Sequence, residues 1–215
     1  MTTKGSGGLH QAFVGIGWNV VKPLSIGANV AYFWGTFERS ISSSSTTYVN
    51  DFSRKYSGNV NSYLVTLGAQ WEQPLSRKDN LTLGVTVGLG HKLRSSYTIE
   101  NGDSTVYDAT NVLSVPMTYG VGLGWTHGTK WFVGADVMMQ KWGSVDFPGS
   151  VQSGANTVYA LRSGLLKDSY KVNVGADYVP NSTSRNLLSR VHYRIGAGYA
   201  TPYYYINGKE GPMEV

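Results

Sequence analysis

Apolar and polar positions alternate with a period of two over most of the chain. Residues 24–35 show this most clearly, because every even position is apolar: Leu24, Ile26, Ala28, Val30, Tyr32 and Trp34. Successive side chains of a strand point to opposite faces, so this segment is predicted to be a strand with one apolar face. The alternation recurs in residues 11–20, 62–72, 81–94, 117–126, 131–140, 170–178 and 191–200. The pattern predicts about eight strands of ~10 residues, the length that crosses a bilayer when tilted.

The connections between the predicted strands alternate in length. Short ones lie near residues 21–23, 74–80, 127–130 and 180–186, and long polar ones near 42–60, 101–116 and 146–169. Short turns at one end and long loops at the other are typical of outer-membrane barrels. No window of strand length shows a convincing helical period, and the best helical candidate is the short segment 159–166.

Aromatic residues decide between a membrane barrel and a soluble sandwich, since alternation fits both. They lie on the apolar face, near the two ends of the predicted strands. Membrane-interface positions are predicted for Trp18, Trp34, Trp71, Trp125, Trp131, Tyr178 and Tyr199. Two such belts around an aliphatic band are typical of the two membrane interfaces. The alternative is that these rings are ordinary core and strand-edge residues, but it does not explain why the opposite face is so rich in glycine.

Charged residues lie on the face opposite the apolar one. Lumen-facing positions are predicted for Glu72, Lys92, Arg94, Asp136, Lys171, Asp177, His192 and Arg194. Cations facing lipid at the midplane would cost about 2–4 kcal/mol each, which favours a lumen. This face either steers a solute or forms paired charges that hold the barrel rigid, and the second interpretation is favoured.

The glycines of the polar face bear on the size of the barrel. An eight-stranded barrel has an interior that side chains just fill, whereas the predicted inward positions include ten glycines. This favours a wider barrel with a plug segment or solvent inside. Residues 203–206 also lead into a further strand that stops at once. We therefore expect residues 1–215 to be a single barrel region, incomplete at both ends.

Composition excludes several classes of protein. Charged residues make up 14%, there are 27 Gly, 15 Tyr and 6 Trp, and Cys is absent. A thiol nucleophile, a thiolate metal site and a disulfide framework are therefore excluded. The formal charge is +5, but Lys and Arg are scattered along the sequence, so we expect no nucleic-acid partner. The expected partners are outer-membrane lipid and an apolar small-molecule solute.

Two segments resemble a known family. They are IGWNVVKPLSIGANVAYFWG (residues 16–35) and LKDSYKVNVGADYVPNSTSRNLLSRVHYRIGAGYATPYYYINGKEG (residues 166–211). Both resemble the FadL/TodX-type outer-membrane transporters of hydrophobic compounds. The resemblance implies about 14 strands, an N-terminal plug and uptake of long-chain fatty acids or similar molecules. The family's plug region and its early Asn-Pro-Ala segment are absent, so its ligand-binding positions are not carried over.

Motifs for catalysis are missing from the sequence. No G-x-S-x-G, Walker A or H-E-x-x-H occurs, and the four His lack metal-ligand spacing. A hydrolase at the loop rim, built from His91, Asp103, Asp108 and Asp146, is a minor alternative. We expect no enzyme activity, cofactor or metal.

The predicted fold is an all-β antiparallel transmembrane barrel, with about eight strands present of ~14. The predicted function is transport of a hydrophobic, fatty-acid-like solute in the outer membrane of a Gram-negative bacterium. The alternative is a small closed eight-stranded barrel that is structural or adhesive through its long loops.

Overall fold

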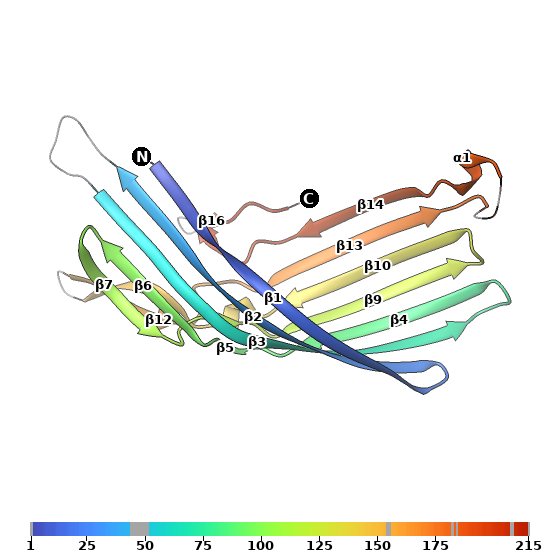
Figure 1. Cartoon of the computed structure of the whole chain (residues 1–215), viewed down its shortest axis with the longest axis horizontal. Coiled ribbons are helices and arrows are strands. Elements are labelled where there is room, and N and C mark those ends of the chain that lie inside the picture. Colours follow the sequence, from blue (N-terminus) through green and yellow to red (C-terminus); the bar gives the residue numbers. More distant parts are fainter. Residues whose placement is uncertain are drawn as a thin grey trace.

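An antiparallel sheet curled into a half-barrel forms most of the molecule (Figure 1). The computed structural model describes residues 2–43, 52–153, 156–181, 183, 185–206 and 209–214. Eight principal strands follow one another in the order β1-β2-β3-β4-β9-β10-β13-β14. They are β1 (Thr2–Val21), β2 (Leu24–Ser43), β3 (Phe52–Pro74), β4 (Asp79–Gly88), β9 (Thr118–His127), β10 (Trp131–Gln140), β13 (Ser169–Tyr178) and β14 (Tyr193–Ala200). The fold-class prediction is thus confirmed, and each predicted strand corresponds to one of these eight.

The first three strands are about twice as long as the sequence pattern predicted. Strands β1 and β2 have 20 residues each and β3 has 23. Strands β2 and β3 continue past the alternating segments into residues 36–43 and 52–60, and of these, residues 42–43 and 52–60 were expected to be loop. Backbone pairing with the neighbouring strand sustains them there, because β2 and β3 stay in register from Leu24↔Trp71 to Ser43↔Phe52.

The predicted long loops contain further strands. Strands β6 (Ser95–Asn101) and β7 (Ser104–Thr110) form a hairpin, and β6 pairs with β3. A second hairpin consists of β11 (Phe147–Ser153) and β12 (Asn156–Arg162). The segment 159–166 was the best helical candidate in the sequence, but its first residues belong to β12. Pairing with β11 overrides the weak helical period there, since a short helix is marginal without packing.

The remaining elements are short. They are β5 (His91–Lys92), β8 (Ser114–Val115), η1 (Trp142–Ser144), α1 (Leu187–Arg190), β15 (Tyr205–Ile206) and β16 (Lys209–Glu210). None of the described helices is long and apolar enough to cross a membrane.

The packed core lies at the long-loop end rather than in the middle of the sheet. Tyr97, Ile99 and Val112 are buried there, with Ile99 only 1% exposed. Elsewhere the apolar face of the sheet is open, and large side chains such as Ile16 and Ile195 are more than three-quarters exposed. An open apolar sheet face is what a lipid-facing wall requires.

Candidate functional site

Glycines line the concave face of the half-barrel in register. Across β4, β9, β10, β13 and β14, one row of opposed residues is Thr82, Gly124, Gly134, Gly175 and Gly196. The adjacent row is Gly84, Gly122, Asp136, Asn173 and Gly198. Directly opposed residues point to the same face of a sheet, so these two rows form one furrow that carries few side chains.

The furrow is a real hollow on the surface of the sheet. It has a volume of about 530 Å³, and residues of both rows line it. The ring of Phe132 lies across one end, over two of the glycines. A Cβ at Gly124 or Gly134 would come within 3.3 or 3.1 Å of this ring, so glycine lets the ring lie flat against the backbone.

Two polar side chains cross the middle of the furrow. Asn173 Nδ2 donates a hydrogen bond to Asp136 Oδ2 at 2.8 Å. Asp136 was one of the predicted lumen positions, and the structure places it on the concave hollow. Asn173 was not singled out from the sequence. It lies on the polar face of the same strand as Lys171, and this position could have indicated it.

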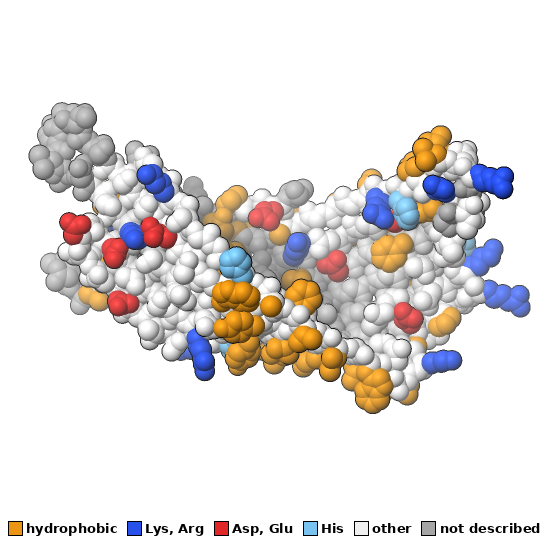
Figure 2. Space-filling view, viewed as in Figure 1, with side chains coloured by type: hydrophobic (Ala, Val, Ile, Leu, Met, Phe, Trp, Pro, Cys, Tyr) orange, Lys and Arg blue, Asp and Glu red, His pale blue; other side chains and the backbone are white. Residues whose placement is uncertain are grey.

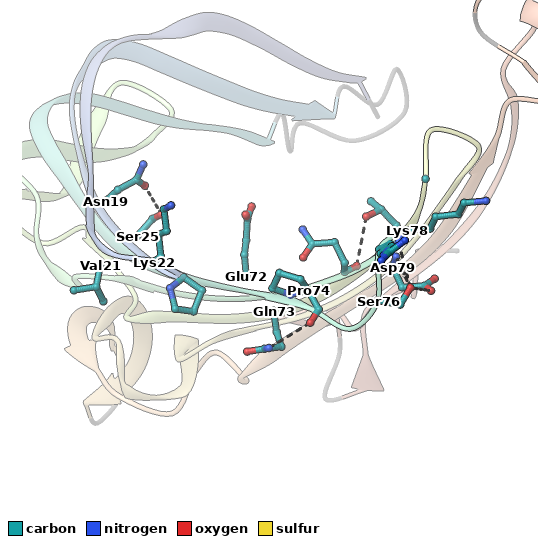
Figure 3. Close-up of a pocket in the computed structure, with 15 residues that line it drawn as sticks. Asn19, Val21, Lys22, Ser25, Glu72, Gln73, Pro74, Ser76, Lys78 and Asp79 are labelled. Atoms are coloured by element: carbon teal, nitrogen blue, oxygen red, sulfur yellow. Dashed lines mark hydrogen bonds between the residues drawn. The ribbon is translucent and has the colours of Figure 1, made fainter.

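A second hollow of about 740 Å³ lies at the short-turn end (Figure 3). Glu72 points into it, as do Asn19 and Ser25, whose side chains are hydrogen-bonded at 2.6 Å. Lys22 and Lys78 also line it. This hollow is therefore more polar than the glycine furrow.

Three of the predicted lumen residues form one charged cluster near the β14 edge. Asp177 accepts a hydrogen bond from Arg194 Nε at 2.9 Å, and His192 Nδ1 lies 3.0 Å from the same carboxylate. The pairing favours the structural interpretation of these charges over a steering patch. Lys171 lies further along the same face of β13, opposite Met138 and Ala200.

The last two predicted lumen residues lie outside the continuous wall. The expected strand 81–94 ends as β4 at Gly88, and β5, which contains Lys92, pairs with β8 instead of β3. Arg94 remains connected to β3 through its carbonyl, which accepts from the Asn61 N–H at 2.9 Å. Residues 81–94 were therefore wrongly taken as one strand. A Cβ at Gly90 would lie 2.5 Å from the Met117 backbone nitrogen, so the chain leaves the strand path where only glycine fits.

This break in the wall contains a histidine. His91 stacks on Tyr63 with 4.5 Å between ring centroids, and its Nε2 lies 3.3 Å from Ser62 Oγ. In the described part of the chain, the three aspartates of the hydrolase alternative make no hydrogen bond to His91. Nor do the described residues include a cluster of three or more His, Asp or Glu that could hold a metal.

The predicted interface aromatics lie at both ends of the sheet. Trp131 and Tyr178 are opposed on β10 and β13 with 4.2 Å between ring centroids. Trp18, Trp71 and Trp125 lie toward the same short-turn end, whereas Tyr199 lies at the long-loop end of β14 and Trp34 about halfway along β2. The depth of these rings in a membrane remains a prediction.

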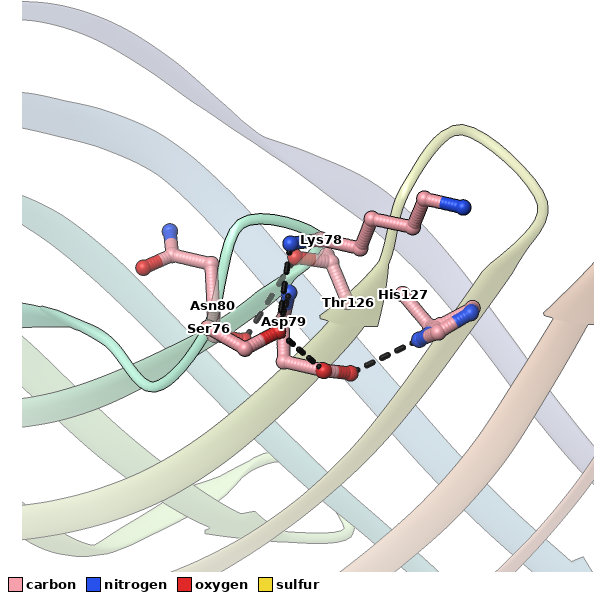
Figure 4. Close-up of polar contacts among 6 residues, drawn as sticks. All are labelled: Ser76, Lys78, Asp79, Asn80, Thr126 and His127. Carbon is pink, nitrogen blue, oxygen red and sulfur yellow. Dashed lines mark hydrogen bonds and ion pairs between the residues drawn. The ribbon is translucent and has the colours of Figure 1, made fainter.

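A serine, an aspartate and a histidine meet at the short-turn end (Figure 4). Ser76 Oγ donates to Asp79 Oδ2 at 2.6 Å, and His127 Nδ1 lies 2.8 Å from Asp79 Oδ1. The aspartate lies between the other two, so the histidine is not placed to deprotonate the serine as in a catalytic triad. The cluster instead joins the turn before β4 to the end of β9.

Comparison with solved structures reveals the same fold. A Pseudomonas aeruginosa FadL homologue aligns at a TM-score of 0.66 and 15% identity, over 96% of this chain and 52% of the homologue. The Pseudomonas putida toluene transporter TodX aligns at 0.58 and 15%, over 90% and 54%. The Ralstonia pickettii toluene transporter TbuX aligns at 0.58 and 13%, over 93% and 59%. The chain thus spans little more than half the length of these proteins.

At such identities the likeness shows the fold alone, which is that of FadL-type outer-membrane barrels. No curated protein matches the chain. The family model BamG, however, matches residues 1–211. Because this match covers almost the whole sequence, the chain belongs to the BamG family.

Proposed function

We propose that this chain is part of an outer-membrane barrel of a Gram-negative bacterium that passes hydrophobic, fatty-acid-like small molecules and performs no catalysis. The observation that carries the proposal is the glycine furrow on the concave face. A row of glycines removes the side chains that would otherwise fill the interior of a barrel. The space suits an apolar solute, because the surface that lines it is largely apolar.

The open edges of the sheet support a larger barrel. Within the described residues, β1 and β14 do not pair with each other, so these eight strands do not close into the small barrel of the alternative interpretation. Apart from the bridge between Ala200 and Glu214, the outer edges of β1 and β14 are unpaired within the described residues. Such edges are an aggregation hazard if nothing covers them. We infer that further strands of the same barrel pair with both edges.

The proposed solute path is tested by filling the furrow with larger side chains. Leucine at Gly84, Gly122 and Gly175 adds volume with little strain, because a Cβ there comes no closer than 3.5 Å to other atoms. We expect the triple variant of the whole protein, reconstituted in liposomes, to take up a labelled long-chain fatty acid at least tenfold more slowly.

A matched control adds the same bulk to the opposite face. Ala69→Leu, Ala176→Leu and Ala197→Leu lie on the apolar face of β3, β13 and β14 and should leave uptake unchanged. Equal uptake by the furrow variant and the wild type would contradict the proposed path. Absence of uptake by the wild-type protein would contradict transport itself.

A further inference from the structure

The net positive charge of the chain lies in four connections at the short-turn end of the sheet. Residues 22–23, 75–78, 128–130 and 179–192 connect the strands at one end of the sheet. They contain six Lys and Arg and no Asp or Glu; we call these six the basic rim: Lys22, Arg77, Lys78, Lys130, Arg185 and Arg190. The rest of the chain has 12 Lys and Arg against 13 Asp and Glu, so the rim accounts for the whole net charge of +5.

The rim charges are free to meet a partner. All six side chains are exposed, and none forms an ion pair within the described part of the protein. The nearest carboxylates are already engaged, since Asp79 is held by His127 and Asp177 by Arg194. Figure 2 shows Lys and Arg side chains along this end of the molecule, at the right of the view.

Aromatic and aliphatic side chains adjoin the rim. Trp131 follows Lys130 directly and lies beside Tyr178, and both belong to the row of interface aromatics. In α1, Leu187 and Leu188 are 70% and 65% exposed, close to Arg190. Cations with exposed rings and leucines around them match the boundary between headgroups and acyl chains. An acidic protein surface would complement the charges but not the exposed leucines.

We propose that the basic rim binds anionic phospholipid headgroups in the membrane leaflet that faces the short turns. This proposal rests on the proposed function only in that the protein lies in a membrane; it does not depend on the passage of a solute. Phosphate oxygens accept hydrogen bonds from guanidinium and ammonium groups. In general, a single Lys or Arg next to an anionic membrane surface favours it by about fivefold.

Quenching of tryptophan fluorescence by brominated lipids tests the proposal at the short-turn end of the molecule. Of the six Trp of this chain, replacing Trp34 and Trp142 with Phe leaves Trp18, Trp71, Trp125 and Trp131, which all lie toward the short turns. The whole protein with these two substitutions is reconstituted into lipid bilayers. We expect brominated phosphatidylglycerol to quench its tryptophan fluorescence several-fold more effectively than brominated phosphatidylcholine does. Raising salt from about 0.05 to 0.5 M should remove the preference, since the Debye length shortens.

Two triple variants distinguish an effect of the basic rim from an effect of positive charge elsewhere in the chain. K78Q/K130Q/R190Q removes three of the six rim cations, one from each of three connections, and the preference should fall clearly below that of the unsubstituted rim. K4Q/R39Q/R162Q removes three exposed cations that lie beyond the short turns, and the preference should persist.

Equal quenching by both lipids in the wild-type background would overturn the rim proposal while leaving membrane insertion intact. This is also the result expected if the rim binds an acidic protein instead. Absence of quenching by either lipid would overturn membrane insertion and the rim proposal together.

Discussion

At the residue scale, one carboxylate holds together the turn that follows β10. Lys141 Nζ donates to Asp168 Oδ2 at 2.6 Å, and the Gly143 N–H donates to Asp168 Oδ1 at 2.9 Å. Both charged groups lie outside the strands, at the long-loop end. These two hydrogen bonds favour the carboxylate and lower the pKa of Asp168 below its usual 3.8, while the carboxylate raises the pKa of Lys141.

The Asp168 contact predicts a defined pH dependence of stability. A depressed carboxyl pKa stabilises the folded state above the unfolded pKa, and this stabilisation is lost as pH falls through the folded value. We expect Asp168→Asn to lower the thermal unfolding temperature at pH 7, because the amide cannot pair as an anion with Lys141. The difference from wild type should shrink steadily below about pH 4, as measured by thermal unfolding in detergent. A difference that stays constant down to pH 2 would contradict this explanation.

At the element scale, the β6–β7 hairpin depends on its own small core. Ile99 on β6 is enclosed with Tyr97 and Val112, and Phe37, Tyr56 and Tyr107 pack against this cluster. Burial of these side chains explains why a predicted polar loop is an ordered hairpin instead. Such a hairpin is marginal alone, so its order depends on this cluster and on pairing with β3.

Removing the central side chain of this core should loosen the hairpin without unfolding the wall. We expect Ile99→Ala to cost about 2–5 kcal/mol of local stability and to increase proteolytic cleavage within residues 95–110. Val106→Ala, at a residue of β7 that is 44% exposed, should change cleavage little. Equal cleavage of the two variants would show that strand pairing alone orders the hairpin.

At the scale of the whole molecule, the open half-barrel is the central feature. Strand β1 is exposed along all of its 20 residues, and β14 has only 8. Because β1 and β14 differ in length, they could not pair with each other along the whole of β1. We therefore expect additional strands between them rather than direct closure of the barrel. The solved FadL-type structures are aligned over only 52–59% of their own lengths.

The mass of the natural protein tests this arrangement. We expect the intact mass of the mature protein, extracted from native outer membrane, to be roughly twice the 23.4 kDa of this chain, because a ~14-strand barrel needs about that length. An intact mass near 23.4 kDa would contradict it and would require two copies or another chain to cover the edges.

The sequence by itself determined the eight principal strands, the face that each apolar residue occupies and the turns between them. These follow from local alternation, since the period of two assigns faces without any knowledge of neighbours. The sequence could not predict the longer first strands or the hairpins at 95–110 and 147–162. Their order depends on backbone pairing and on contacts such as that of Ile99 with Val112.

Only the tertiary structure decided where the sites are. Gly124, Gly134 and Gly175 are separated along the chain, and strand register alone places them in one furrow. Likewise, Lys22 and Arg190 are scattered in the sequence but lie at one end of the sheet, since every second connection of an antiparallel meander returns to the same end. Alternation is a property of each strand, whereas a furrow or a charged rim exists only after the strands are aligned with one another.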